Sequence, residues 1–392
     1  MKKSFLLGIL FVGIVLLLAI GVAFDRQSSP DVIPPDSEYE PYIEVSLNEK
    51  HISLVGGVVE EWTKWEMSAT DLYNKYRGEG RIYAAKNVVI NWSIFDIPEE
   101  SNISNIYFEL SNEKNFQNAK KYTLRADERS VELSNLFVDA EYFFRISVEL
   151  DNSKVYVAED NFKTKWSPRI IEFENLRNIR DIGGWKTVEG KTIKQGLIYR
   201  GCELDGATEN KYVITQGGLD LMINGLNIKS ELDLRASNLE GVKDMLGIGV
   251  NHQYFSFLSY SEIFTEYGAN KLREVFGALS KEENYPIYLH CTYGADRTGT
   301  VCYILEALLG MSEEDCYREW ELSILTNGGA FYDEMDVFVD AIQKIKGSTL
   351  QEKVENYLIS IGVTEIEIEN IRKIMLEDYA SGGNGMDENV VS

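Results

Sequence analysis

The chain begins with a continuous apolar run. Lys2 and Lys3 are followed by an uncharged stretch over residues 4–24. A transmembrane helix needs about 20 apolar residues, whereas the apolar region of a cleaved signal has only about 7–15. We therefore expect residues 1–24 to be a signal anchor, and the small-x-small pattern Gly21-Val22-Ala23 keeps a cleaved signal peptide as the alternative. Because N-terminal lysines remain cytoplasmic, the rest of the chain is expected outside the cytoplasm, either membrane-anchored or secreted after cleavage.

The pattern then changes from apolar to polar and becomes mixed. Residues 25–41 are rich in Pro, Ser and acidic side chains, a composition typical of an extended linker. Residues 42–85 show no clear period and stay unassigned, apart from one short helix expected within residues 60–76.

From residue 86 to residue 165, apolar and polar side chains alternate with a period of two. Short strands at regular spacing, separated by polar turns, predict an all-β sandwich. Trp92 and Tyr142 lie in two of these strands, and we interpret both as core residues rather than as ligand-binding aromatics. The expected strands cover residues 88–94, 105–110, 130–133, 142–148 and 161–164.

One spacing in this region resembles a known feature of β-sandwiches. Leu136 precedes Tyr142 by six residues at the start of a strand. This is similar to the tyrosine corner of fibronectin type III and immunoglobulin-like domains. The resemblance implies a fibronectin type III-like sandwich over residues 86–165, whose binding partner the sequence does not indicate.

Beyond Trp166-Ser167-Pro168, strand-like and helix-like segments alternate, which is typical of an α/β domain. Residues 228–234 and 286–290 are predicted to be buried strands. Apolar residues at i, i+3, i+4 and i+7 predict a helix over residues 298–309 with one apolar face, and Gly310 is its expected C-cap.

The remaining residues complete the predicted organisation. Residues 312–378 are expected to be helical throughout, and the polar tail over residues 381–392 to be disordered. The prediction is a multi-domain chain in which an N-terminal signal or transmembrane helix precedes an all-β sandwich. An α/β domain over residues 166–380 follows, with a central sheet flanked by helices.

Composition removes several classes of function. The 392 residues carry a formal net charge of −24, which argues against a nucleic-acid partner, because phosphate backbones are bound by an excess of Lys and Arg. The chain has three histidines and four cysteines, and no Cys-x-x-Cys pair. Neither a metal site nor a disulfide scaffold is expected from this set, and no cofactor is predicted.

The segment from His290 to Gly299 carries the candidate chemistry. Cys291 is expected between a buried strand and the N-terminus of a helix, where the helix dipole and free N–H groups favour a thiolate nucleophile. The following N–H groups can form a nest for phosphate oxygens, and Gly294 permits the positive φ that such a loop needs. The expected phosphate-binding positions are Thr292, Tyr293, Gly294, Ala295 and Thr298.

Four side chains around these positions complete the expected site. Arg297, six residues after Cys291, can bind two phosphate oxygens bidentately. Asp296 is the first candidate for the general acid that protonates the leaving group, with Asp181 and Asp205 as reserves. The Thr298 hydroxyl is expected near the sulfur, and His290 is interpreted as a residue that orders the loop.

At these residues the sequence resembles the bacterial atypical tyrosine and dual-specificity phosphatase family, whose loop reads His-Cys-x-x-Gly-Lys-Asp-Arg-Thr-Gly. The Asn-x-Arg-Asp-x-Gly-Gly element of that family is matched by residues 178–184, and its following Tyr-Arg strand by residues 196–200. The end of the family's central strand is matched by Asp233-Leu234-Arg235. The resemblance covers about residues 171–379.

The resemblance implies a phosphoric monoester hydrolase in which Cys291 is the nucleophile, Arg297 binds phosphate and Asp296 is the acid. Arg180, Asp181, Asp233 and Arg235 would either contact the substrate or, as we favour, form ion pairs that brace the loop, and His290 and Arg200 are further supporting residues. One position departs from the family, because Ala295 stands where relatives have Lys. Without that charge, phosphotyrosine and phosphoserine or phosphothreonine rank above multiply phosphorylated substrates.

Alternatives stay open at this point. They are a phosphoinositide or inositol-phosphate phosphatase, an inactive phosphate-binding or adhesion module, and a rhodanese-like sulfur transferase. Cys202 is either an unpaired small residue, which is favoured, or a partner for Cys291 in a protective disulfide. Cys302 and Cys316 are interpreted as core residues.

Overall fold

A computed structural model describes residues 40–77, 84–235, 241–327 and 332–377. The predicted signal or anchor (1–24), most of the predicted linker (25–41) and the predicted tail (381–392) therefore lie outside the described residues. Within the described residues, no helix is long and apolar enough to cross a membrane.

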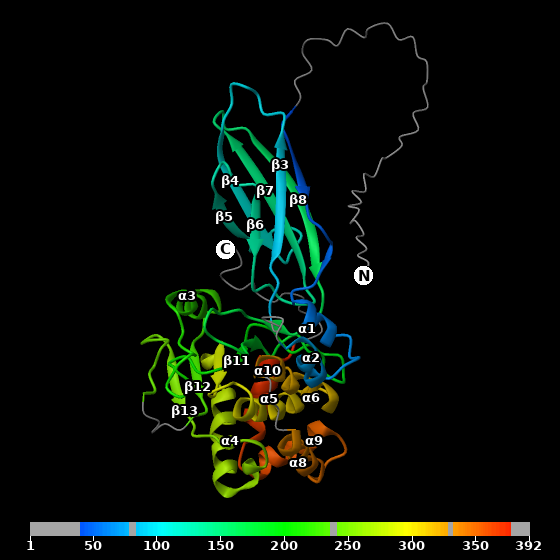
Figure 1. Ribbon diagram of the computed structural model, residues 1–392, viewed down its shortest axis with the longest axis vertical. Coiled ribbons are helices and arrows are strands. Elements are labelled where there is room, and N and C mark those ends of the chain that lie inside the picture. Colours follow the sequence, from blue (N-terminus) through cyan, green and yellow to red (C-terminus); the bar gives the residue numbers. More distant parts are fainter. Residues whose placement is uncertain (1–39, 78–83, 236–240, 328–331, 378–392) are drawn as a thin grey trace, which may run out of the picture. The chain divides into compact units, whose positions relative to one another are not determined.

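The N-terminal part consists of two β-sheets that enclose one hydrophobic core (Figure 1). The first sheet has the order β1-β3-β6 and the second the order β2-β8-β7-β4-β5. All neighbours are antiparallel except β2 and β8. The strands are β1 (Tyr42–Ser46), β2 (His51–Ile52), β3 (Val88–Phe95), β4 (Ile103–Ser111), β5 (Lys120–Leu124), β6 (Ser130–Leu133), β7 (Glu141–Leu150) and β8 (Val155–Thr164).

The period-two pattern produces this core directly. In β3, Val88, Ile90 and Trp92 are buried while the residues between them are exposed. Tyr142 is buried as well, and its hydroxyl accepts a hydrogen bond of 2.8 Å from the backbone N–H of Phe137. The predicted β-rich region is confirmed, and the two aromatic residues lie in its core. The likeness to fibronectin type III domains stays a prediction.

Two details of this region differ from the sequence-based expectation. β5 was not predicted, because its sequence Lys-Lys-Tyr-Thr-Leu contains no run of apolar residues and none of its side chains is fully buried. The single helix expected within residues 60–76 is instead two helices, α1 (Gly57–Trp62) and α2 (Ala69–Tyr76). They are separate because Trp65 adopts a left-handed conformation (φ 62°), and Ser68 caps the second helix by accepting a hydrogen bond from the Asp71 N–H.

The α/β part is built on a six-stranded sheet with the order β13-β12-β14-β11-β10-β9. The four strands β11 to β14 are parallel, and β10 and β9 continue the sheet antiparallel. Both expected strands are present, each slightly shorter than predicted. The strands are β9 (Arg169–Ile170), β10 (Arg180–Asp181), β11 (Ile198–Gly201), β12 (Ser230–Asp233), β13 (Asn251–Tyr254) and β14 (Ile287–His290).

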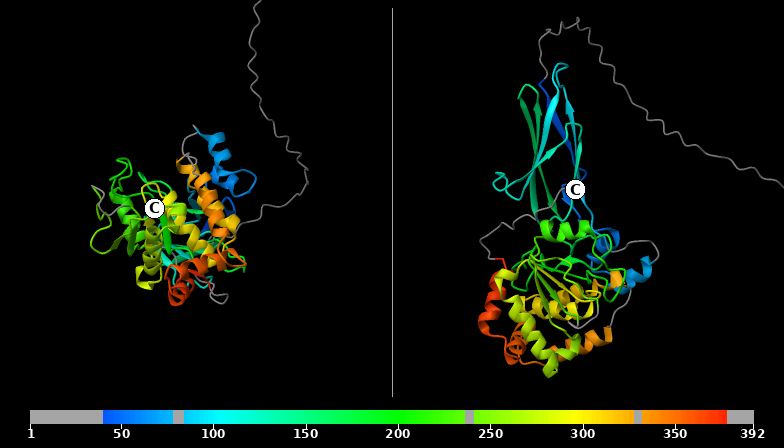
Figure 2. Two further views of the ribbon diagram at one scale, coloured as in Figure 1. Left: turned by 90° about the horizontal axis from the view of Figure 1, so that it is seen from below. Right: turned by 90° about the vertical axis from the view of Figure 1, so that its left-hand side faces the viewer.

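Helices cover both faces of this sheet, and two separate cores result. In the right-hand view of Figure 2, the short green helix lies on one side of the strands and the yellow to red helices lie on the other. Ile287 and Leu289 of β14 contribute to the larger core, and Tyr288 between them contributes to the smaller one. The helices are α3 (Gln216–Asp220), η1 (Leu221–Gly225), η2 (Tyr260–Phe264), α4 (Glu266–Leu279), η3 (Glu282–Asn284), α5 (Asp296–Leu309), α6 (Glu313–Glu321), α7 (Ile324–Asn327), α8 (Tyr332–Gln343), α9 (Leu350–Ser360) and α10 (Glu365–Met375).

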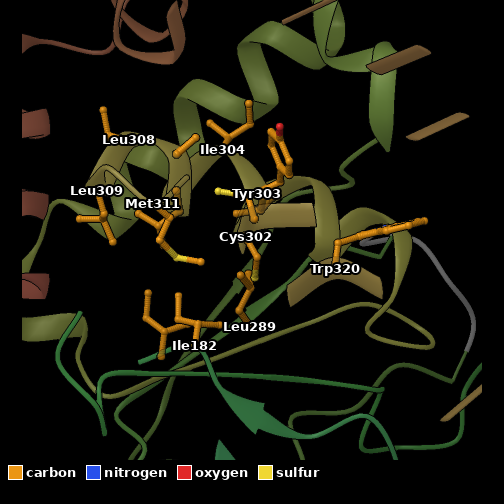
Figure 3. Packing of buried hydrophobic residues seen from close by; sticks show 14 of the residues in the cluster. Ile182, Leu289, Cys302, Tyr303, Ile304, Leu308, Leu309, Met311 and Trp320 are labelled. Carbon is orange, nitrogen blue, oxygen red and sulfur yellow. The ribbon is translucent and has the colours of Figure 1, made fainter. Parts of the chain in front are cut away.

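α5 lies at the centre of the larger core, as Figure 3 shows around Cys302, Ile304 and Leu308. It begins two residues before the predicted start and ends at Gly310 (φ 96°), the predicted C-cap. The expectation of a single apolar face was wrong, because every residue from Thr298 to Leu309 is buried. α6 and α9 both pack against α5.

Segments that precede the β-sandwich in the sequence, and one within it, contact the α/β part. Before it, Trp62 of α1 donates from Nε1 to Glu321 of α6 at 2.9 Å, and Arg318 lies over the Trp62 ring at 4.2 Å. Within it, Val138 exchanges two hydrogen bonds of 2.9 Å with the Gln195 side chain. Residues 57–76, which the sequence left largely unassigned, are thus packed partly against α6 and α7.

Candidate active site

The candidate site is the loop that joins β14 to α5. β14 is fully buried and ends at His290, and α5 begins at Asp296. Gly294 has φ 68°, and a Cβ at this position would lie 2.4 Å from the carbonyl oxygen of Gly201. Glycine is therefore required at this position, both by the backbone conformation and by the close approach of β11.

The carbonyl oxygens of the loop are bound by neighbouring groups. The Tyr293 oxygen accepts from Asn178 Nδ2 at 3.1 Å, and the Gly294 oxygen accepts from Arg200 Nη2 at 2.7 Å. The Thr292 oxygen accepts from the Glu203 N–H at 3.2 Å. Within the described part of the chain, the backbone N–H groups of residues 292–298 have no acceptor. This arrangement orients the peptide units so that their N–H sides remain available to an anion.

Two of the groups that hold these carbonyls, Arg200 directly and Asn178 through Arg180, are linked to one buried carboxylate, that of Glu319 in α6. Arg180 Nε donates to Glu319 at 2.6 Å, and Arg200 forms a second ion pair with the same carboxylate. Arg180 also donates to the Asn178 side chain, which in turn holds the Tyr293 carbonyl. Burial alone would raise the pKa of Glu319, but Arg180 and Arg200 outweigh it and the pKa is lowered.

Glu319 was missed by the sequence analysis. A signal was present, since Glu319 lies beside Trp320 and three residues after Cys316, on the apolar face of an amphipathic helix. A charged residue on such a face needs a buried partner. The partner, however, lies 139 residues away in Arg180 and cannot be read from the local pattern.

Asp181 is fully used by structural contacts. Its Oδ2 atom accepts from Arg169 Nη1 at 2.7 Å and from the Gly196 N–H at 2.5 Å, and its Oδ1 atom accepts from the Gly183 N–H at 2.8 Å. It is 1% exposed, which leaves no route for a proton to a substrate. These contacts do not suit the reserve acid role that the sequence analysis left open for Asp181.

Arg235 is surrounded by three carboxylates. It contacts Asp233 at 2.7 Å, Glu203 at 2.6 Å and Asp205 at 2.8 Å. Burial would raise the pKa of Asp205, but hydrogen bonds from Arg235 and from the N–H groups of Ala207 and Lys243 lower it to about 2. Asp205 is therefore ionised at neutral pH and is a poor proton donor, which disfavours the second reserve acid.

His290 belongs to a separate buried charge cluster, which it forms with Glu231 and His252. Its Nε2 atom lies 2.8 Å from Glu231 Oε1, and His252 Nδ1 lies 2.7 Å from the other oxygen of the same carboxylate. Burial would lower the pKa of His290, but Asp233 and Glu231 raise it to about 9. Burial would raise the pKa of Glu231, but the two histidines lower it to about 2. Glu231 was also missed, because alternation within a buried strand does not distinguish it from a surface residue.

The residues expected to perform the chemistry converge at the loop. Cys291 is 2% exposed, and Arg297 donates from Nη2 to the Thr292 hydroxyl at 3.1 Å. The Thr298 hydroxyl is buried and has no hydrogen-bond partner among the described residues. Asp296 accepts a hydrogen bond of 2.7 Å from the Tyr260 hydroxyl, and Tyr293 is exposed beside the loop, where its hydroxyl donates to Glu209.

Cys202 lies directly after β11, where the parallel pairing of Gly201 with His290 continues toward Cys291. Its sulfur accepts from the Arg177 N–H at 3.2 Å, and burial raises its pKa to about 12. All four cysteines are buried free thiols. The structure thus contains Cys202 as an unpaired thiol.

Known proteins are similar to this chain over its α/β part. A curated relative from Cupriavidus necator, which carries the name "putative tyrosine-protein phosphatase", is 26% identical over 166 residues. The match covers 37% of this chain and 59% of the relative, so the chain spans less than two thirds of that protein's length.

Among solved structures, the core catalytic domain of the PP-IP phosphatase SIW14 from S. cerevisiae, crystallised with citrate, is similar to this chain at 17% identity. That match covers 48% of this chain and 88% of the yeast domain, with a TM-score of 0.28. The sequence pattern of the tyrosine phosphatase family matches residues 171–377, more than half of the chain and all of the loop described above. The chain therefore belongs to the tyrosine phosphatase family.

Proposed function

We propose that this chain is a cysteine-dependent phosphatase that hydrolyses phosphate monoesters through a phosphocysteine intermediate. The observation that carries the proposal is the loop between β14 and α5. Its carbonyl oxygens are held by Asn178, Arg200 and Glu203, and its N–H groups have no acceptor in the described chain. A loop with this polarity stabilises a dianionic phosphate and the charge that develops in the transition state.

The first step is attack by Cys291 on phosphorus. The S–P bond forms as the P–O bond to the leaving group breaks, and Asp296 gives its proton to the departing oxygen. Arg297, held near the loop by its hydrogen bond to Thr292, binds two of the phosphate oxygens bidentately.

In the second step, water attacks phosphorus and Asp296 takes a proton from it, while the S–P bond breaks. The departing thiolate accepts a hydrogen bond from Thr298, whose buried hydroxyl has no other partner among the described residues. The sum is phosphate monoester plus water to alcohol plus inorganic phosphate, with Cys291 regenerated.

Phosphotyrosine is the first-ranked substrate, followed by phosphoserine or phosphothreonine. Ala295 contributes no charge to the loop, and Glu209 contacts exposed Tyr293 beside it. A substrate with several phosphate groups meets less positive charge here than in relatives with Lys at this position. Phosphoinositides and inositol phosphates are therefore the second candidate class.

The sequence of residues 1–24 supports a location for the enzyme. We place the catalytic domain outside the cytoplasm, attached through an N-terminal helix or released by cleavage after Ala23. The β-rich region over residues 86–165 would then lie between the membrane and the catalytic domain in the sequence. Mass spectrometry of the mature N-terminus distinguishes the anchored from the cleaved form.

A substrate panel tests the proposed function. Phosphotyrosine and phosphoserine peptides, inositol phosphates and phosphoinositides are incubated with the wild type and with Cys291→Ser, and phosphate release is measured. We expect release from phosphotyrosine peptides that Cys291→Ser abolishes. Preferential release from inositol phosphates would shift the substrate class, and no release from any substrate would support the inactive phosphate-binding module.

A further inference from the structure

We propose that Tyr260 is a positioning residue that holds Asp296 with one defined carboxylate oxygen free to exchange a proton with the substrate. The inference rests on the proposed function, because it assigns Tyr260 a role through the general acid. Tyr260 opens η2, 36 residues before Asp296 in the sequence, and its hydroxyl donates to Asp296 Oδ1 at 2.7 Å. Its side chain is 6% exposed and packs in the larger core.

The direction of this hydrogen bond follows from the groups around the hydroxyl. Trp320 Nε1 lies 3.3 Å from the Tyr260 oxygen, and an indole N–H can only donate. The Tyr260 oxygen therefore acts as the acceptor toward Trp320, and its single proton is directed to Asp296. Asp296 Oδ1 is occupied as an acceptor as a result, and the proton used in catalysis is assigned to Oδ2.

The backbone of Tyr260 is attached to the same turn of α5. The Tyr260 N–H donates to the Thr300 hydroxyl at 2.8 Å, and this hydroxyl donates to the Asp296 carbonyl oxygen at 2.9 Å. Tyr260 thus contacts Asp296 through its side chain and, by way of Thr300, through its backbone. Its φ of 51° is unusual for a residue with a side chain, and these contacts keep it there.

The indole donor is also held against α5. A Cβ on Gly299 would lie 2.8 Å from Trp320 Cδ1, so the absence of a side chain at Gly299 permits this packing. Figure 3 shows Trp320 beside the helix and its buried neighbours. Trp320 therefore donates to Tyr260, and Tyr260 donates to Asp296. These two hydrogen bonds form a chain that ends on the proposed general acid.

A carboxylate held at one oxygen has less rotational freedom than a free one, which matters for proton transfer over a hydrogen-bond distance. The dependence on the leaving group should reveal this role. A poor leaving group needs its proton in the transition state, and a good one does not. Loss of the Tyr260 hydroxyl should therefore slow hydrolysis mainly for substrates with a poor leaving group.

The experiment compares Tyr260→Phe with the wild type on a phosphotyrosine peptide and on an aryl phosphate with a nitrated, good leaving group. Phenylalanine keeps the ring in the core, and thermal melting confirms that the variant is folded. We expect kcat/KM to fall about tenfold for the peptide and less than about threefold for the activated substrate. Tyr267→Phe is the matched control, because this neighbouring hydroxyl donates to the Ser256 carbonyl instead.

A double-mutant cycle with Asp296→Asn separates the possible failures. If Tyr260 acts through Asp296, Tyr260→Phe adds no further loss in the Asp296→Asn background. A loss that is equal for both substrates, or that multiplies with Asp296→Asn, would overturn the role of Tyr260 while the phosphatase function stands. If the wild type releases no phosphate from any substrate, the proposed function fails and the inference fails with it.

Discussion

The β-rich region and the α/β domain bury different kinds of side chain. In the described residues from 86 to 165, the buried residues are hydrophobic apart from Ser111, Ser147 and Thr164, and none of them is charged. The α/β domain buries four arginines together with the carboxylates that pair with them. Burying a charge is costly unless it is paired and hydrogen-bonded.

The difference indicates what each region is built for. An apolar core suffices to hold two sheets together, because the hydrophobic effect has no direction. The α/β domain must in addition hold the carbonyl oxygens of an anion-binding loop, and this requires donors with fixed geometry. Arg200 donates to the Gly294 carbonyl directly, Arg180 acts through Asn178, and Glu319 neutralises and orients both arginines.

The strongest test of this comparison is Glu319→Gln. The substitution leaves two buried guanidinium groups without their shared carboxylate, and breaking a buried pair costs about 3–5 kcal/mol. We expect a loss of this size in the free energy of unfolding, and a fall in kcat/KM of more than about 100-fold, because the loop carbonyls lose their orientation.

The matched control is Glu321→Gln in the same helix. Glu321 pairs with Arg318 and Trp62 and makes no contact with the loop. Denaturant unfolding and phosphate release, measured on both variants, separate a loss of stability from a loss of loop orientation. Near wild-type activity in folded Glu319→Gln would show that the two arginines hold the loop without the carboxylate.

The buried cluster of His290, Glu231 and His252 predicts how the stability of the fold depends on pH. The pKa of His290 is raised to about 9 in the folded protein, so its contribution is fully present below its ordinary value of 6.5 and is lost as the pH rises through 9. The pKa of Glu231 is lowered to about 2, so its contribution is present above 4.5 and is lost as the pH falls toward 2. Each can amount to at most about 3.5 kcal/mol.

Glu231→Gln should reduce the loss of stability at both high and low pH, since it removes the carboxylate that links the two histidines. Denaturant unfolding of wild type and variant at pH 6, 7.5 and 9 measures the alkaline limb. The interpretation of His290 as a charged residue would be wrong if the wild type lost no stability over this range.

The smallest expected effect lies in the β-rich region. Ile146 is fully buried in β7, and Ile146→Val removes one methylene group from an apolar core. We expect about 0.5–1.5 kcal/mol less stability and kcat/KM within about twofold of wild type. A larger change in activity, measured well below the melting transition, would show that this region also adjusts the catalytic loop.

Much of the fold followed from periodicity. The alternation in residues 88–94 and the apolar run before Cys291 each correspond to a strand, and Gly310 ends α5 as predicted. Periodicity failed for α5 itself, which is buried on all sides and contacts helices that come later in the chain. It also failed for β5, whose strand conformation comes from pairing with β4 rather than from its own residues.

The sequence by itself determined the local chemistry of the loop. Cys291, Gly294, Asp296, Arg297 and Thr298 are neighbours in the chain, and their spacing alone places a thiol, a positive-φ turn and a guanidinium around one helix N-terminus. Only the tertiary structure decided what holds them. Glu319 lies 139 residues from Arg180 and 119 from Arg200, and Tyr260 lies 36 residues from Asp296. A pattern read over a few helical turns carries no information on such pairs, because the folding of distant segments onto one sheet brings them together.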